Sequence, residues 1–130
     1  MAKFITKLDV SPVPGPGRLW ITDAPFVVES DIMGVIQIPA GFVFDGNSLP
    51  RVVWVESLPT DFLESGCVHD WLYKHNSNRK ENDQVYREML KVQGVGKFRR
   101  NFRYWVLRLA GGRAFKQDQA ATLAASRKVA

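Results

Sequence analysis

Three side chains in the second half of the chain have the types and spacing needed for acid–base chemistry. His69 and Tyr73 lie four residues apart, so they share one face of a helix. Asp83 lies about one turn into the next expected helix, and the short connection makes the two helices antiparallel. A carboxylate that faces an imidazole fixes its tautomer and supports the imidazolium. The residues therefore predict a general base at His69, oriented by Asp83, with Tyr73 beside them.

Oxygen-bearing residues near His69 predict a cation site. Asp70 is rotated by about 100° from His69 around the helix, so its carboxylate points sideways. The turn Asp45-Gly46-Asn47-Ser48 offers oxygen ligands of the kind that a hard divalent cation prefers. We expect Asp70, Asp45 and Asn47 to bind a divalent cation, calcium or zinc. A structural alternative stays open, in which His69-Asp70 is a hydrogen-bonded helix feature and the turn caps its own backbone.

The remaining cysteine and histidine offer little chemistry. Cys67 is two residues from His69 and faces another way, which disfavours a Cys–His nucleophile pair and indicates a small core residue. A single cysteine also excludes an internal disulfide and a cysteine-based zinc cluster. His75 is too isolated to supply the second metal-binding histidine that a phosphohydrolase of the HD type needs.

The elements that must position these residues fall into two halves. Short β-branched and aromatic runs separated by Pro and Gly predict strands at 3–10, 19–22, 26–29, 34–38 and 41–44. Helical spacing then predicts helices from Thr60, as N-cap, to His75, from Arg79 to Gln93 and from Lys97 to Ala110. The pattern indicates an α+β fold with one small antiparallel sheet of about four or five strands packed with three helices.

The length of 130 residues fits a single domain. Within it we expect a β-rich half at 3–50, a three-helix half at 60–110 and a tail at 113–130 that could form a further helix. No apolar run is long enough for a signal peptide or a membrane span. We therefore expect the protein in the cytoplasm of the cell that makes it, unless it leaves by lysis, by a holin-like route or inside a particle.

The third expected helix combines basic and aromatic residues. Phe98, Phe102, Trp105, Val106 and Leu109 have the spacing of a core stripe, which makes the basic residues between them a solvated face. The formal net charge of +5 favours anionic partners. A membrane surface is one such partner, whereas the small size of the basic patch and the absence of known motifs disfavour nucleic acid.

The order of motifs resembles an uncharacterised family of small proteins encoded by tailed phages and prophages. The resemblance rests on IPAGFVFDGNSLP at 38–50, VHDWLY at 68–73 and the two helices that follow, over roughly residues 19–110. It implies a phage origin and an α+β fold, and it brings no established activity. The protein would then be found in the cytoplasm of the infected bacterium or in the virion.

A narrower stretch is similar to the paired helices of the secreted phospholipase A2 superfamily. The stretch is His69-Asp70-x-x-Tyr73 followed by Asp83-x-x-Tyr86-x-x-Met89. The resemblance implies that His69 activates a water, Asp70 binds calcium, and Asp83 orients His69 with support from Tyr73. The bracing disulfides and the calcium-loop pattern of that superfamily are absent, and the interval from His69 to Asp83 is shorter than usual.

These observations favour a hydrolase-like phage protein that uses a His–Asp dyad against an ester or amide of the host envelope, either lipid or peptidoglycan. The alternative is a non-enzymatic virion or tail-associated component, or a host-directed binding protein, on a phospholipase-like helical scaffold. Its partners would be an envelope component or other phage proteins. An intracellular nucleic-acid binder is the third reading, and it predicts binding that weakens steeply with salt.

Overall fold

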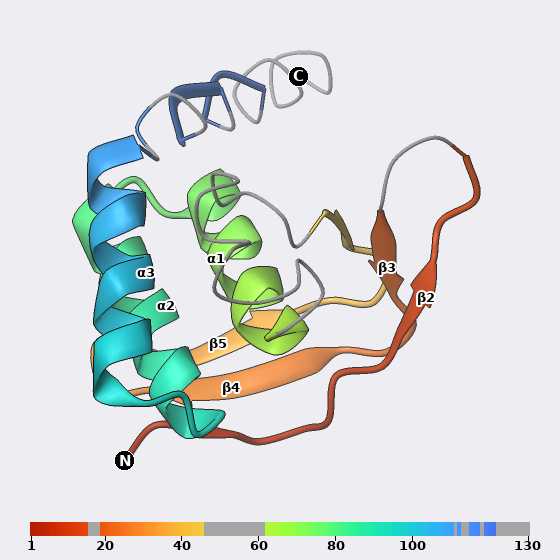
Figure 1. Ribbon diagram of the computed structural model, residues 1–130. Coiled ribbons are helices and arrows are strands. Elements are labelled where there is room, and N and C mark those ends of the chain that lie inside the picture. Colours follow the sequence, from red (N-terminus) through yellow and green to blue (C-terminus); the bar gives the residue numbers. More distant parts are fainter. Residues whose placement is uncertain (16–18, 46–61, 111, 113–114, 118, 122–130) are drawn as a thin grey trace.

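The structure is a computed structural model that describes residues 1–15, 19–45, 62–110, 112, 115–117 and 119–121. Among these residues, six short strands precede three main helices, and a short C-terminal helix includes residues 115–117 and 119–121. The α+β class is therefore confirmed. In Figure 1, β4 and β5 lie beneath the helices, β2 and β3 stand to one side, and α3 lies at the opposite edge.

The strands form two small antiparallel sheets rather than the single sheet expected from the sequence. One sheet has the order β1-β4-β5 and the other β2-β3-β6. The expected strand at 3–10 is wrong as a continuous element, because its two ends pair in different sheets. The strands are β1 (Lys3–Phe4), β2 (Val10–Pro12), β3 (Trp20–Thr22), β4 (Phe26–Ser30), β5 (Gly34–Ile38) and β6 (Val43–Phe44).

Strand β4 supplies the sheet side of the main core. Its side chains alternate, so that Phe26, Val28 and Ser30 are buried and the residues between them are partly exposed. Antiparallel pairing places Phe26 opposite Ile38 and Val28 opposite Ile36 on β5. The apolar residues of this face pack with one another, with Phe44 of β6 and with apolar residues of two helices: Cys67, Val68, Leu72, Val85 and Met89.

The helices begin and end close to where the sequence predicts. They are α1 (Leu63–His75), α2 (Arg79–Val92) and α3 (Lys97–Ala110). Helix α1 has Phe62 at its N-cap, in a left-handed conformation with φ 60°, whereas the predicted cap Thr60 lies outside the described residues. Helix α2 begins at a conventional cap, because the Asn78 side chain accepts a hydrogen bond from the backbone N–H of Glu81.

Helix α3 presents the opposite face to the core from the one predicted. Its buried residues are Arg103, Tyr104 and Leu107, and Leu107 packs with Tyr86, Leu90 and Val95. Four of the five residues predicted to form a core stripe are instead exposed: Phe98 by 86%, Phe102 by 38%, Trp105 by 59% and Leu109 by 86%. We call these four residues the α3 stripe.

The physical reason lies in the side chains that can make specific contacts with α2. Arg103 is buried because its guanidinium donates to the Tyr86 hydroxyl at 3.2 Å and lies 5.0 Å from the Phe62 ring centroid. The guanidinium carbon of Arg87 lies 3.9 Å from the ring centroid of Tyr104 and covers that ring. Periodicity identifies both faces of such a helix but does not say which one meets the core.

Candidate functional site

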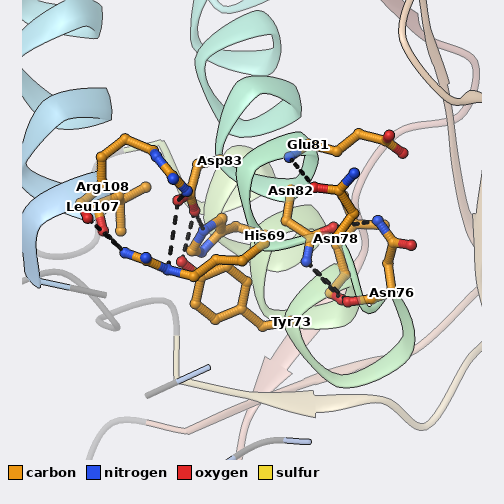
Figure 2. A network of polar contacts seen from close by, with 11 residues as sticks. His69, Tyr73, Asn76, Asn78, Glu81, Asn82, Asp83, Leu107 and Arg108 are labelled. Carbon is orange, nitrogen blue, oxygen red and sulfur yellow. Dashed lines mark hydrogen bonds and ion pairs between the residues drawn. The ribbon is translucent and has the colours of Figure 1, made fainter. Parts of the chain in front are cut away.

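The predicted acid–base residues come together where α1 and α2 run side by side. The hairpin between them is closed by Asn82, which is fully buried and donates to the backbone oxygens of Leu72 and Asn76. The Asn76 amide in turn donates to Asn82 Oδ1 at 2.6 Å. Figure 2 shows this asparagine group beside the cluster that contains His69 and Asp83. Asn82 thus fixes the position of α2 along α1, and with it which residues of the two helices face each other.

His69 lies against Asp83, as the sequence predicts. Its Nε2 is 2.9 Å from Asp83 Oδ1, and the Tyr73 hydroxyl donates to the same oxygen at 2.6 Å (Figure 2). The ring of His69 also packs at 4.0 Å from the ring of Tyr73 and at 5.1 Å from that of Tyr86. His69 is only 2% exposed and Asp83 is fully buried. The catalytic role of these residues stays a prediction.

Two arginines complete the surroundings of Asp83. Arg108 of α3 places Nη1 at 3.1 Å from Asp83 Oδ2, and Nε of Arg79 lies 3.9 Å from the same oxygen. Arg79 also donates through Nη2 to the backbone oxygens of Leu107 and Arg108, at 2.5 and 2.9 Å, which ties the end of α3 to the start of α2. We call His69, Tyr73, Asp83, Arg79 and Arg108 the Asp83 cluster.

The cluster keeps Asp83 ionised. Burial raises the pKa of Asp83, but the hydrogen bonds from His69, Tyr73 and Arg108 outweigh it and leave the pKa below its ordinary value of 3.8. Burial, and then the hydrogen bond to Asp83, raises the pKa of Tyr73, so its phenol stays a donor. An ionised carboxylate can only accept, so Nε2 of His69 carries the hydrogen.

In a neutral His69, this tautomer would leave Nδ1 as the proton acceptor. Within the described part of the chain, Nε2 is the only ring nitrogen of His69 that has a hydrogen-bond partner. A neutral imidazole held in this way can take a proton at Nδ1 while Asp83 stabilises the resulting cation. The arrangement is that of a general base with its orienting carboxylate.

The predicted cation ligands are only partly brought together. The Asp45 backbone N–H donates to Asp70 Oδ2 at 3.3 Å, so the start of the turn lies against Asp70. Asn47 lies outside the described residues. Among those that are described, no group of three or more His, Cys, Asp or Glu side chains is placed to hold a metal ion. The contact seen makes Asp70 an anchor for the strand end, and its role as a cation ligand stays a prediction.

Cys67 is a core residue, as its spacing indicates. Its side chain is fully buried in the main core, and burial raises the pKa of the thiol far above its ordinary value. His75 lies on the other side of α1, exposed and against Trp71 at 3.8 Å between ring centroids.

Sequence reasoning missed three residues that shape the site: Asn82, Arg79 and Arg108. Asn82 lies next to Asp83 in a helix, where an asparagine carries no distinctive signal. Arg108 belongs to a helix whose basic residues were all assigned to a solvated face. Basic residues are common both near the C-terminus of a helix, as Arg108 is, and at its first position, as Arg79 is. Their spacing in the sequence therefore does not indicate that either one contacts a buried carboxylate.

None of the helices in the described part of the chain has the length and apolar character needed to cross a membrane. A family model described as a protein of unknown function, DUF1353, matches residues 20–107, which include all of the Asp83 cluster except Arg108. No curated protein and no solved structure matches the chain. Because the match spans more than half of its length, the chain belongs to the DUF1353 family.

Proposed function

We propose that the protein is a phage-encoded, hydrolase-like enzyme that activates water at His69 against an ester or amide of the host envelope. The observation that carries the proposal is the contact of 2.9 Å between His69 Nε2 and the buried, ionised Asp83. This contact leaves Nδ1 as the basic nitrogen. The envelope substrate, lipid or peptidoglycan, and the phage origin rest on the resemblance of the motif order to phage-encoded proteins.

In the proposed reaction, Nδ1 of His69 takes a proton from a water as its oxygen attacks the carbonyl carbon of the substrate. The tetrahedral intermediate then collapses, and the proton on Nδ1 passes to the departing alcohol or amine. Asp83 keeps its charge throughout and stabilises the imidazolium through the Nε2 hydrogen bond. Tyr73 and Arg108 act as positioning residues, because they hold the Asp83 carboxylate that orients the ring.

The likeness to the helices of the phospholipase A2 superfamily supports this assignment of roles. In that comparison His69 is the base, Asp83 its orienting carboxylate and Tyr73 the support. Contacts of 2.9 and 2.6 Å join the Asp83 carboxylate to His69 and to the Tyr73 hydroxyl, and they support these roles. The comparison also favours an ester of a phospholipid among the envelope substrates.

A divalent cation near Asp70, calcium or zinc, belongs to the proposal as an aid to oxyanion stabilisation. The described residues place only Asp45 and Asp70 there, joined through a backbone N–H rather than through paired oxygen ligands. The steps above are therefore assigned to His69 and Asp83 alone. Activity measured with added calcium or zinc and with a chelator tests the cation separately.

The direct test compares the wild-type chain with His69→Ala on phospholipid and cell-wall substrates. Loss of a positioned general base predicts a fall in activity of about 100-fold or more. His75→Ala is the matched control, because it removes the one other histidine from an exposed position. Added imidazole is expected to restore part of the activity of His69→Ala, which a purely structural defect would not allow. A wild-type chain with no activity on any of these substrates, with or without metal, overturns the proposal.

The second candidate function is a non-enzymatic virion-associated or host-directed binding module. It is favoured by the slight exposure of His69, 2%, together with the exposed aromatic residues on α3. Diethylpyrocarbonate modification followed by mass spectrometry separates the two functions. Modification of both histidines supports the enzyme, whereas modification of His75 alone supports the binding module. The binding module also predicts that the chain occurs in purified particles in fixed stoichiometry.

A further inference from the structure

The α3 stripe lies on the face of the helix that points away from the core. At about 100° per residue, Phe98, Phe102, Trp105 and Leu109 fall within a narrow sector, and Leu107 of the buried face lies roughly opposite them. Figure 1 shows α3 at the outer edge of the molecule, with α2 on its inner side. The stripe is thus a continuous apolar surface about three turns long that the described elements leave exposed.

The charged side chains of α3 are all basic. The sequence of α3 contains five basic residues and no acidic one; Arg103 and Arg108 turn inward, which leaves Lys97, Arg99 and Arg100 beside the stripe. Lys97 and Arg99 are exposed and flank the stripe on opposite sides of the helix. An apolar stripe with aromatic residues and basic borders is the pattern of a helix that lies in the interface of an anionic membrane.

Two adjoining hollows lie along this surface: an open one formed by residues of α3 alone, and a second that continues past the start of α3 to α2 and the N-terminal residues. A cavity of about 570 Å³ is lined by Lys97, Asn101 and the aromatic residues Phe98, Phe102 and Trp105. A second cavity of about 720 Å³ shares Lys97 and Asn101 with it and is also lined by the basic residues Arg87, Lys91 and Arg100. An apolar hollow next to a cationic one suits a molecule with an acyl chain and an anionic headgroup.

The acidic residues that line the larger cavity are already engaged. Glu88 accepts hydrogen bonds from the Ser30 hydroxyl at 2.6 Å and from the Asp31 backbone N–H at 2.9 Å. Asp31 lies 3.1 Å from the amino-terminal nitrogen. Four basic side chains thus line the cavity against two carboxylates, so the charge that it offers to a ligand is positive.

A second copy of the chain fits the α3 stripe less well than an anionic surface does. Packing α3 against α3 of another copy would bring the basic borders of the two helices together, with no acidic residue in either helix to offset them. Nucleic acid would satisfy the cations, but it would leave the aliphatic end of the stripe at Leu109 without an apolar partner. A phospholipid surface satisfies both.

We propose that the outer face of α3 is a docking surface for anionic phospholipid membranes. The α3 stripe enters the interface, and Lys97 and the basic cavity beside it face the phosphate headgroups. Docking at this face needs no activity at His69, so it is independent of the proposed hydrolysis.

The test is co-sedimentation of the full chain with vesicles of phosphatidylcholine, with and without phosphatidylglycerol. Binding is expected only when phosphatidylglycerol is present, and added salt should weaken it. The double variant Phe98→Ser/Trp105→Ser should bind about tenfold more weakly, because two partly inserted aromatic side chains are lost. Val35→Ser is the matched control, since Val35 is an exposed apolar residue on β5, away from α3.

Charge and depth are tested by two further variants. Lys97→Glu should weaken binding by about fivefold or more, whereas Lys7→Glu, at an exposed position in the first half, should have little effect. Lipids with brominated acyl chains should quench the fluorescence of Trp105, and Trp105→Phe should remove that quenching while retaining most of the binding. All of these positions are exposed, and unchanged circular dichroism would confirm that the fold is retained.

Three results would overturn the proposal. The first is no binding to vesicles that contain phosphatidylglycerol, or binding that Phe98→Ser/Trp105→Ser leaves unchanged. The second is self-association in analytical ultracentrifugation that the same double variant abolishes, which would assign the α3 stripe to a second copy. The third is binding to DNA or RNA without binding to vesicles, which would assign the basic border to nucleic acid.

Discussion

The Asp83 cluster and the α3 stripe place polar and apolar side chains in the opposite way to the usual pattern. In the Asp83 cluster a carboxylate, an imidazole and an arginine meet in the interior. In the α3 stripe, large apolar side chains remain at the surface. Helix α3 contributes to both regions with adjacent residues, because Arg108 reaches inward to Asp83 while Leu109 points outward.

The difference shows that partners, rather than residue type, decide which side chains of α3 are buried. Arg103 and Arg108 turn inward because Tyr86 and Asp83 accept their hydrogen bonds. The aromatic residues of the α3 stripe lie on the opposite face of the helix and remain exposed. Burying paired charges contributes little net stability, so the Asp83 cluster is weak evidence of a role in folding, and the chemistry that we propose at His69 would give the cluster a separate role.

Removing the carboxylate of Asp83 should destabilise the Asp83 cluster more than any other change proposed here. Asp83→Asn leaves His69, Tyr73 and Arg108 facing a neutral group, and we expect a loss of about 3–5 kcal/mol in the free energy of unfolding, as for other broken buried pairs. Urea unfolding followed by circular dichroism measures the loss. Asp9→Asn, at an exposed position, should change stability by less than about 0.5 kcal/mol. An Asp83→Asn protein as stable as the wild-type chain would show that the charge of Asp83 does not hold the cluster together.

Substitution of one leucine on each face of α3 compares how much the two faces contribute to stability. Leu107 is fully buried against Leu90 and Val95, whereas Leu109 is 86% exposed. We expect Leu107→Ala to cost about 2–5 kcal/mol in the free energy of unfolding and Leu109→Ala less than about 0.5 kcal/mol. Thermal or urea unfolding of the two variants gives the comparison. Equal losses would mean that the α3 stripe is covered in solution.

The lowered pKa of Asp83 predicts how the stability of the Asp83 cluster changes at acid pH. Because the pKa is lower in the folded chain than in the unfolded one, the stability that ionisation of Asp83 contributes is fully present above the ordinary value of 3.8. It is lost as the pH falls through the folded-state pKa. The difference in unfolding free energy between the wild-type chain and Asp83→Asn should therefore be constant near neutral pH and shrink in this acid range. A difference that does not change with pH would contradict the ionised state.

Periodicity and turn residues were enough to predict the fold class, the ends of α2 and α3 and the meeting of His69 with Asp83. These features depend on local spacing and on a short hairpin. The split of the first strand, the inward face of α3 and the arginine contacts of Asp83 depend on which elements pack together. Arg108 is 25 residues from Asp83, and nothing in the residues around it distinguishes it from Arg99 or Arg100.

The hydroxyl of Tyr73 offers the smallest and most specific change to the inner region. Tyr73→Phe retains the ring that packs on His69 and Phe115 and removes only the hydrogen bond of 2.6 Å to Asp83 Oδ1. Asp83 keeps its contacts with His69 and Arg108, so the free energy of unfolding should fall by only about 0.5–1.5 kcal/mol. Losing a donor to the carboxylate should also raise the pKa of Asp83, which moves the acid loss of stability to higher pH. A variant that unfolds at the same pH as the wild-type chain would show that Arg108 and His69 alone hold the charge, and Tyr73 would then have no part in positioning the base.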